Sequence, residues 1–123
     1  MLESAWFENK NGTFTAHILP LDAQVSCTKR IVVHDFTRDG KPDLLLLGND
    51  ENNMPETGPY DASSGILLAA DGHGGWKWVP NRQHGLWAGG ELRDALLLRT
   101  RVESGVLLTA ENNGRLRKWS FQK

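Results

Sequence analysis

The chain has a single cysteine, Cys27, among its 123 residues, so no disulfide can form within it. We expect this cysteine to be a small residue packed near the start of a strand. No apolar run approaches the roughly 20 residues that a membrane-spanning helix needs. The formal net charge is only −1 and the Lys and Arg residues are scattered, so we expect neither a nucleic-acid surface nor membrane insertion. Residues 1–6 also lack the basic start and apolar core of a signal peptide.

Glycine and tryptophan, in contrast, are abundant. The chain has 13 glycines and five tryptophans, with 39% apolar and 24% charged residues. These proportions are ordinary for one globular unit with a modest core. The many glycines suit tight turns between strands, so we expect an all-β segment across residues 1–123.

One stretch, residues 35–43, carries oxygen-bearing side chains at regular intervals. They fall at its first, third, fifth and ninth positions, which are Asp35, Thr37, Asp39 and Asp43. Gly40 is sixth, where such a loop turns most sharply, and the backbone carbonyl of Lys41 is seventh. Calcium binds about six to eight oxygens, and three carboxylates this close would repel one another without a cation. The spacing predicts a calcium loop with five ligand residues: Asp35, Thr37, Asp39, Lys41 and Asp43.

The segments on either side of this loop are short and apolar. They are residues 30–34 and 43–48, and Pro42 and Gly48 leave the second too short for a helix. We expect a strand on each side of the loop, with the second strand buried on both faces. An EF-hand is excluded, because its flanks are helical and its twelfth position is a Glu where this chain has Leu46.

Residues 30–48 resemble the FG-GAP/VCBS repeats of the integrin-alpha-like β-propellers, whose blades carry an aspartate-rich calcium loop between their first two strands. The turns at residues 9–14, 60–65 and 71–75 are similar to that family too, so the resemblance covers nearly the whole chain. It is a resemblance to the C-terminal two-blade portion of a bacterial exported member. It implies a structural Ca²⁺ and an extracellular, periplasmic or cell-surface location, with the signal sequence outside this chain. The family prefers Asn or Asp where this chain has Thr37, which implies a weak site, with a Kd of roughly 10⁻⁴ to 10⁻³ M.

The expected strands form three groups. Residues 1–20 would be the closing hairpin of one blade, residues 29–80 a complete blade with the calcium loop, and residues 90–122 a partial last blade. This fold is a partial β-propeller of about two four-stranded antiparallel blades, whereas closed propellers have about four to eight. Either a longer chain supplies the remaining blades, or copies of this chain complete a ring as a homo-oligomer. We favour the longer chain, because stacked units with uncovered faces need neighbours; a third alternative is an independent small β-sheet domain.

A sequence repeat of about 60 residues accompanies this division. Residues 105–112 align with residues 43–49, and residues 93–95 align with residues 34–36. The second copy of the loop would then be residues 96–105, where arginines replace the carboxylates. Only one calcium site is therefore expected.

Two further features are candidates for ligand contact. The longest loop, residues 49–64, is either a surface that contacts a ligand or partner, or a solvated connector between two strands of a blade. Trp87 lies in a loop, where it could stack on a sugar or peptide or fill space between blades. The other four tryptophans lie in expected strands and would pack between blades: Trp6, Trp76, Trp78 and Trp119.

The sequence shows no catalytic pattern. The four histidines have no zinc-ligand spacing, and no Gly-x-Ser-x-Gly motif is present. The clustered carboxylates are explained by calcium rather than by glycoside hydrolysis. We therefore expect a non-catalytic, calcium-binding module for binding or scaffolding, as in cell adhesion, with a protein or glycan ligand. The alternative is a substrate-positioning, carbohydrate-binding part of a larger enzyme.

Overall fold

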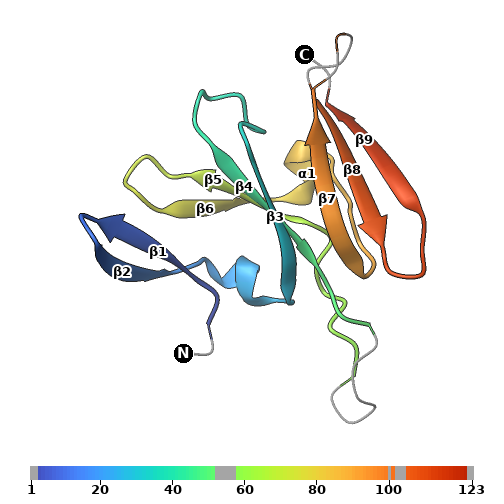
Figure 1. Cartoon of the computed structure of the whole chain (residues 1–123), viewed down its shortest axis with the longest axis horizontal. Coiled ribbons are helices and arrows are strands. Elements are labelled where there is room, and N and C mark those ends of the chain that lie inside the picture. Colours follow the sequence, from blue (N-terminus) through green and yellow to red (C-terminus); the bar gives the residue numbers. More distant parts are fainter. Residues whose placement is uncertain (1–2, 52–57, 100, 102–104, 122–123) are drawn as a thin grey trace.

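The computed structural model describes residues 3–51, 58–99, 101 and 105–121, and it is all-β apart from two single-turn helices (Figure 1). The strands are β1 (Ala5–Lys10), β2 (Thr13–Ile18), β3 (Thr28–His34), β4 (Asp43–Gly48), β5 (Ile66–Ala70), β6 (Trp76–Val79), β7 (Leu92–Leu98), β8 (Gly105–Glu111) and β9 (Leu116–Phe121). The helices are the 3₁₀ turn η1 (Leu21–Gln24) and α1 (Asn81–His84).

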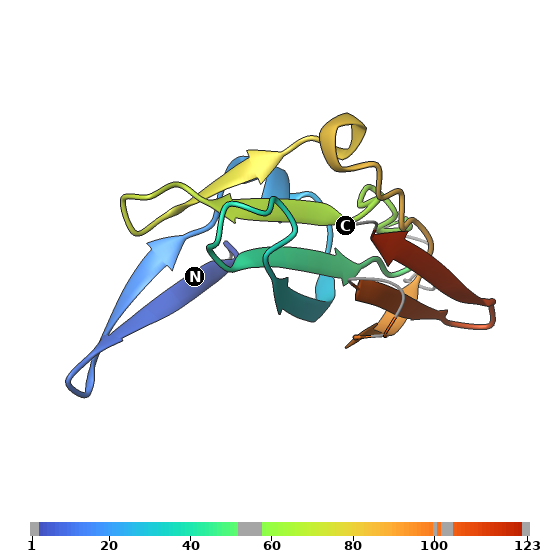
Figure 2. The same ribbon diagram turned by 90° about the horizontal axis from the view of Figure 1, so that it is seen from above.

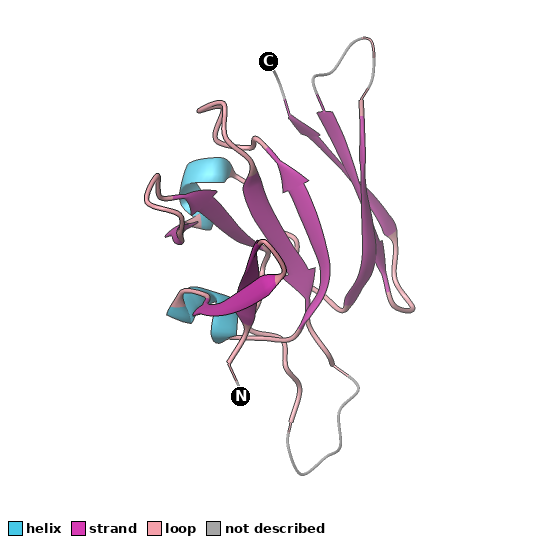
Figure 3. Cartoon of the chain, turned by 60° about the vertical axis from the view of Figure 1, so that its left-hand side comes forward, coloured by secondary structure: helices cyan, strands magenta, loops and turns pink. Residues whose placement is uncertain are grey.

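The strands form three separate antiparallel sheets, and none closes on itself within the described part of the chain. The sheets are β1-β2, β3-β4-β5-β6 and β7-β8-β9, each in sequence order. The grouping of strands into two, four and three is the one that the sequence predicts. The sheets lie next to one another, with β3 against β7 near the middle of the molecule (Figures 1 and 3).

The four-stranded sheet is the centre of the fold, because each of its faces contributes to one of the two hydrophobic cores. Figure 2 shows it between the β1–β2 hairpin and the third sheet. Leu45 and Leu47 of β4 pack on one face against the third sheet and the segment after α1. Leu46, between them, packs on the other face against the segment that follows β2. All three are at most 3% exposed. The prediction that this strand is buried on both faces is confirmed, and the period of two explains why consecutive leucines serve two cores.

Both connections between sheets begin with a proline followed by a single helical turn. Pro20 precedes η1 and Pro80 precedes α1, and each proline ends an outer strand and starts a single helical turn. After α1, Gly85 takes a left-handed conformation (φ 75°), and its N–H donates to the carbonyl of Asn81. The chain then turns back toward β7, which carries Leu86 into the core at 4% exposure.

The strand pairs β3–β4 and β7–β8 share one frame. Each contains a register shift near the start of its first strand, at Thr28/Arg30 and at Leu92/Asp94. Each second strand is also followed by an asparagine whose backbone N–H makes the same kind of hydrogen bond. The N–H of Asn49 donates to the carbonyl of Cys27 at 3.1 Å, and that of Asn112 to the carbonyl of Glu91 at 2.8 Å. The two strand pairs are therefore alike in register and in this hydrogen bond, and Asn49 and Asn112 occupy equivalent places, whereas the sequence repeat itself stays a prediction.

The alignment of residues 93–95 with residues 34–36 is wrong. When the two strand pairs are superimposed on their register shifts, Asp94 is equivalent to Arg30, which lies early in β3. Asp35, in contrast, follows the end of β3. The second copy of the loop is also shorter than predicted, because residues 96–98 belong to β7. A leucine run carries no signal that separates strand from loop, which is why the boundary was misplaced.

Two expectations about packing are also corrected. Cys27 is exposed rather than packed, and its backbone carbonyl is the part that makes a structural contact. Trp78 lies in β6 as predicted but is 39% exposed. The other strand tryptophans, Trp6, Trp76 and Trp119, do pack against the two cores. Among the described residues, no helix has the length and apolar character to cross a bilayer.

Candidate metal loop and the adjoining cavity

The predicted calcium loop connects β3 to β4 at one end of the central sheet. His34 and Asp43 form the last pair of the β3–β4 ladder, so residues 35–42 make up the connection itself. Two of its residues have left-handed backbones, Arg38 at φ 60° and Gly40 at φ 81°. Glycine adopts this conformation without strain, so the sixth-position glycine is explained by the turn.

Two carboxylates of the loop accept hydrogen bonds from its backbone. Asp35 Oδ1 accepts from the N–H of Asp39 at 3.1 Å, and Asp35 Oδ2 from the N–H of Gly40 at 3.0 Å. Asp39 Oδ1 accepts from the N–H of Lys41 at 2.9 Å. These bonds hold the loop in a compact turn, and each carboxylate oxygen still has a second lone pair for a cation.

Asp43 is the most unusual member of the loop, because its carboxylate is fully buried at 0% exposure. Its Oδ2 accepts the N–H of Thr37 at 2.8 Å, whereas Oδ1 is buried with no hydrogen-bond partner among the described residues. A buried carboxylate oxygen without a partner is destabilising. A cation beside it would remove that cost, so the residues present fit a bound hard cation.

The loop does not, however, present a finished cluster of ligands. In the described ranges, no group of three or more His, Cys, Asp or Glu side chains is arranged to hold a metal ion. The predicted ligand set includes two residues outside those types, the hydroxyl of Thr37 and the backbone carbonyl of Lys41. Because Thr37 is exposed and Asp35 and Asp39 bond to backbone N–H groups, calcium at this loop stays a prediction.

The loop lies beside the turn between β5 and β6. A Cβ atom added at Gly72 would lie 3.5 Å from Nζ of Lys41, so the two turns are in contact range. In that neighbouring turn, Asp71 Oδ1 accepts the N–H groups of His73 at 2.7 Å and Gly75 at 2.9 Å. These two hydrogen bonds lower the pKa of Asp71 below its ordinary value. Asp71 therefore stabilises its own turn and is not free to join the loop.

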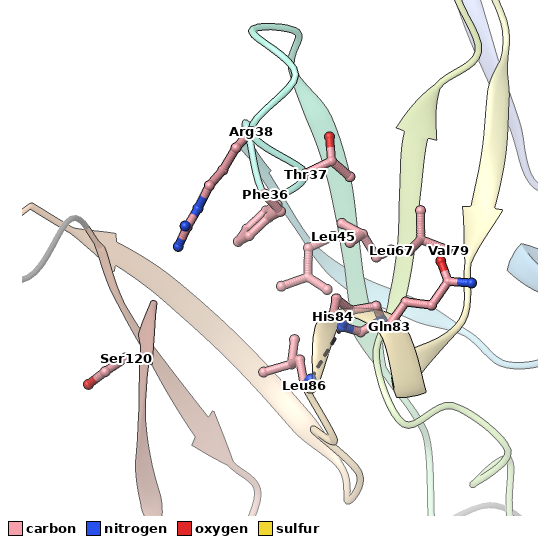
Figure 4. Close-up of a pocket in the computed structure, with 10 residues that line it drawn as sticks. All are labelled: Phe36, Thr37, Arg38, Leu45, Leu67, Val79, Gln83, His84, Leu86 and Ser120. Atoms are coloured by element: carbon pink, nitrogen blue, oxygen red, sulfur yellow. Dashed lines mark hydrogen bonds between the residues drawn. The ribbon is translucent and has the colours of Figure 1, made fainter. Parts of the chain in front are cut away.

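A cavity of about 500 Å³ adjoins the other side of the loop (Figure 4). Its walls come from the loop, β4, β5, the β6–α1 segment and β9. The lining residues are Phe36, Thr37, Arg38, Leu45, Leu67, Val79, Gln83, His84, Leu86 and Ser120. Three buried leucines form its floor, and polar side chains stand around its opening.

His84 of α1 is the polar group deepest in this cavity. Its Nδ1 accepts the N–H of Leu86 at 3.2 Å, which fixes the neutral tautomer with the proton on Nε2. Nε2 is buried and has no hydrogen-bond partner of good geometry among the described residues. Burial lowers the pKa of His84, and the nearby backbone of Val79 acts in the opposite direction. Burial therefore favours the neutral form of the ring.

Two buried asparagines support this region, and the sequence analysis did not identify either as structural. Asn49, at 0% exposure, donates to the carbonyls of Ser63 at 2.7 Å and Gly90 at 3.2 Å, and its Oδ1 accepts from the N–H of Ser63 and the hydroxyl of Ser26. Asn81 donates to three carbonyls, those of Ser64, Gly65 and Leu86. The signal that could have found Asn49 is its place at the end of an apolar strand, aligned with Asn112 of the repeat.

Charged residues join the central sheet to the third sheet. Glu91, only 2% exposed, lies 3.8 Å from Nζ of Lys29 on β3 and also pairs with Arg93. Arg30 of β3 donates to the carbonyl of Ala95 at 3.0 Å. These contacts fix β3 against β7 at the seam between the sheets.

The remaining candidates from the sequence are only partly described. In the long loop, residues 52–57 lie outside the described residues, and Asp50 pairs with Tyr60 across its base. Trp87 is 59% exposed and lines a shallow groove with Trp78, Pro80 and Arg82. This groove is separate from the cavity beside the metal loop.

Comparisons with known proteins leave the family open. Neither a protein-family model, nor a curated protein sequence, nor a solved structure matches this chain. The functional argument therefore depends on the residues of the chain alone.

Proposed function

We propose that this chain is a non-catalytic, calcium-binding repeat module of the β-propeller type that serves in binding or scaffolding. The observation that supports it most directly is the buried carboxylate of Asp43, whose Oδ1 has no hydrogen-bond partner in the described structure. The ion would link β4 to the loop that precedes it, with Asp35, Thr37, Asp39, the carbonyl of Lys41 and Asp43 as ligands. Its role would be structural, since ligation couples metal binding to folding.

Exposed apolar residues support the idea that further blades flank this chain. On β3, Ile31 and Val33 are 51% and 59% exposed, although their partners Leu46 and Leu44 on the same face contact the core beside η1. The far face of the third sheet is similar, with Leu96 53% exposed. We infer that these faces are covered by the remaining blades of a longer chain or by copies of this chain. An exported or cell-surface protein is the setting we propose.

Calcium binding is tested by thermal unfolding in EDTA and in millimolar calcium. The wild-type melting temperature should rise with calcium, since an ion at ten times its Kd adds about 1.4 kcal/mol to the free energy of unfolding. Asp39→Ala should abolish the rise, whereas Asp61→Ala, which removes an exposed acid outside the loop, should keep it. An unchanged calcium response in Asp39→Ala would place the ion elsewhere.

A carbohydrate-binding role within a larger enzyme is the second candidate, and the groove between Trp78 and Trp87 favours it. Exposed tryptophan rings offer flat apolar faces on which sugars stack. A saccharide that quenches tryptophan fluorescence in the wild type but not in Trp87→Ala would support this role. Turnover of a glycan by the isolated chain would contradict the non-catalytic proposal.

A further inference from the structure

The cavity beside the metal loop has the size and lining of a small-molecule site. Its volume of about 500 Å³ falls within the range of roughly 300 to 1,000 Å³ that such sites occupy. Leu45, Leu67 and Leu86 line it and are each no more than 4% exposed. An apolar wall with a few convergent polar groups is the usual composition of a ligand pocket.

The charge of the lining selects the kind of ligand. The cavity has no acidic residue, and its one permanent charge is the guanidinium of Arg38. Figure 4 shows the Arg38 side chain directed into the gap between the loop and β9. In the described structure this guanidinium has no ion-pair partner, and the neighbouring acids Asp35 and Asp39 accept hydrogen bonds from the loop backbone instead. A carboxylate is the ligand group that would complement it.

Gln83 lines the same cavity and is exposed, so its amide N–H groups can donate to a ligand oxygen beside Arg38. His84 also lines the cavity, but its Nε2 is buried away from the open space, and the backbone of Val79 acts on the ring as a hydrogen-bond partner. Arg38 is therefore the group that would hold the carboxylate.

We propose that this cavity binds a small amphipathic carboxylic acid, with its apolar body against Leu45, Leu67 and Leu86 and its carboxylate at Arg38. This inference goes beyond the proposed function, because it assigns a ligand class to a cavity that adjoins the calcium loop and shares Thr37 and Arg38 with it, and it needs no bound ion. It also differs from sugar binding at Trp87, which lies outside this cavity.

The test uses sodium decanoate as the probe, measured by isothermal titration calorimetry on the whole chain in EDTA. Decan-1-ol has the same length without the charge, and acetate has the charge without the apolar body. We expect saturable binding of decanoate that is about tenfold tighter than binding of decan-1-ol, the effect expected of one charge-assisted hydrogen bond. Decanoate should bind more than about a hundredfold tighter than acetate, since it has eight more CH₂ groups to bury at about 0.8 kcal/mol each.

Two variants separate this site from non-specific adsorption. Arg38→Gln should weaken decanoate about tenfold and leave decan-1-ol unchanged, whereas Arg82→Gln, an exposed cation at the separate tryptophan groove, should change neither.

The location is checked by NMR. Decanoate should shift the backbone amide signals of Arg38, His84 and Ser120 with one common saturation curve. The proposal is overturned if decanoate does not bind saturably, if decan-1-ol binds as tightly, if the two arginine variants lose affinity equally, or if the shifts map to the exposed hairpin β1–β2 instead. Because Arg38 is exposed, its variant is expected to fold, which keeps the comparison valid.

Discussion

Asn49 joins three segments of the chain through one side-chain amide: the turn before β3, the end of the long loop and the segment before β7. Replacing it with alanine should lower the free energy of unfolding by about 3 kcal/mol, because the N–H and carbonyl of Ser63 would remain buried without partners. Urea unfolding measures this loss. Asn49 has a positive φ of 96°, and Asn113, which is exposed, has a positive φ of 51°. Asn113→Ala is therefore the matched control and should lower the free energy of unfolding by only about 1 kcal/mol. Equal losses in the two variants would assign the effect to backbone strain.

His84 should make stability depend on pH. Its pKa is lowered by burial, so in the range between that pKa and its ordinary value of about 6.5 the unfolded chain binds a proton that the folded chain does not. The contribution of His84 to stability is therefore complete above about pH 6.5 and falls as the pH is lowered toward the folded pKa. Unfolding midpoints in urea at pH 7, 6 and 5 should decrease in the wild type and change less in His84→Asn. His73→Asn, in an exposed turn, should keep the wild-type slope.

At the residue level, the sequence predicts which side chains are chemically unusual better than it predicts which are buried. The carboxylates at residues 35, 39 and 43 stand out by spacing alone, and the loop does connect two strands. The burial of Asn49 and Asn81 could not be predicted, because asparagine is common in exposed turns and its buried partners are backbone groups distant in sequence. The cavity was missed for a similar reason, since its walls come from five separate segments.

Strands were the most predictable elements of this chain. Short apolar runs bounded by Gly, Pro and Asp place β4 and β5 correctly, and Pro20 and Pro80 mark the ends of outer strands. The repeat was harder to align, because a register shift of one residue moves every side chain to the other face. The two shifts, near Arg30 and Asp94, have no sequence signature of their own.

The end of β4 packs closely against the backbone of the turn before β3. A Cβ atom at Gly48 would lie 1.9 Å from the carbonyl oxygen of Cys27, which is a backbone atom that cannot rotate away. Gly48→Ala should therefore lower the free energy of unfolding by about 2 to 3 kcal/mol, as overpacking does. Gly89→Ala should have little effect, because its Cβ would meet nothing within 4 Å. Melting temperatures of the two variants compare them directly, and a stable Gly48→Ala would mean that the turn before β3 moves freely.

The whole molecule has open sheets and uncovered apolar faces, which makes its state of association informative. Light scattering with and without millimolar calcium should show single chains or an ill-defined aggregate, since we favour a longer protein as the source of the remaining blades. The physical reason is that stacked units with uncovered faces need neighbours to complete their cores. A discrete ring-sized oligomer would instead show that copies of the chain complete the fold, and would move the search for a ligand to the assembled face.

The shared frame of β3–β4 and β7–β8 makes the chain a host for loop transplantation. The last pair of the first ladder, His34 and Asp43, encloses eight residues (35–42), and the last pair of the second, Leu98 and Val106, encloses seven (99–105). Replacing those seven residues with the sequence of residues 35–42, together with Val106→Asp, would reproduce the whole oxygen pattern on a second ladder. The molecule therefore provides both the donor segment and the acceptor scaffold for a two-site variant, in which metal stoichiometry could be adjusted with changes to the first two residues of β8, Gly105 and Val106.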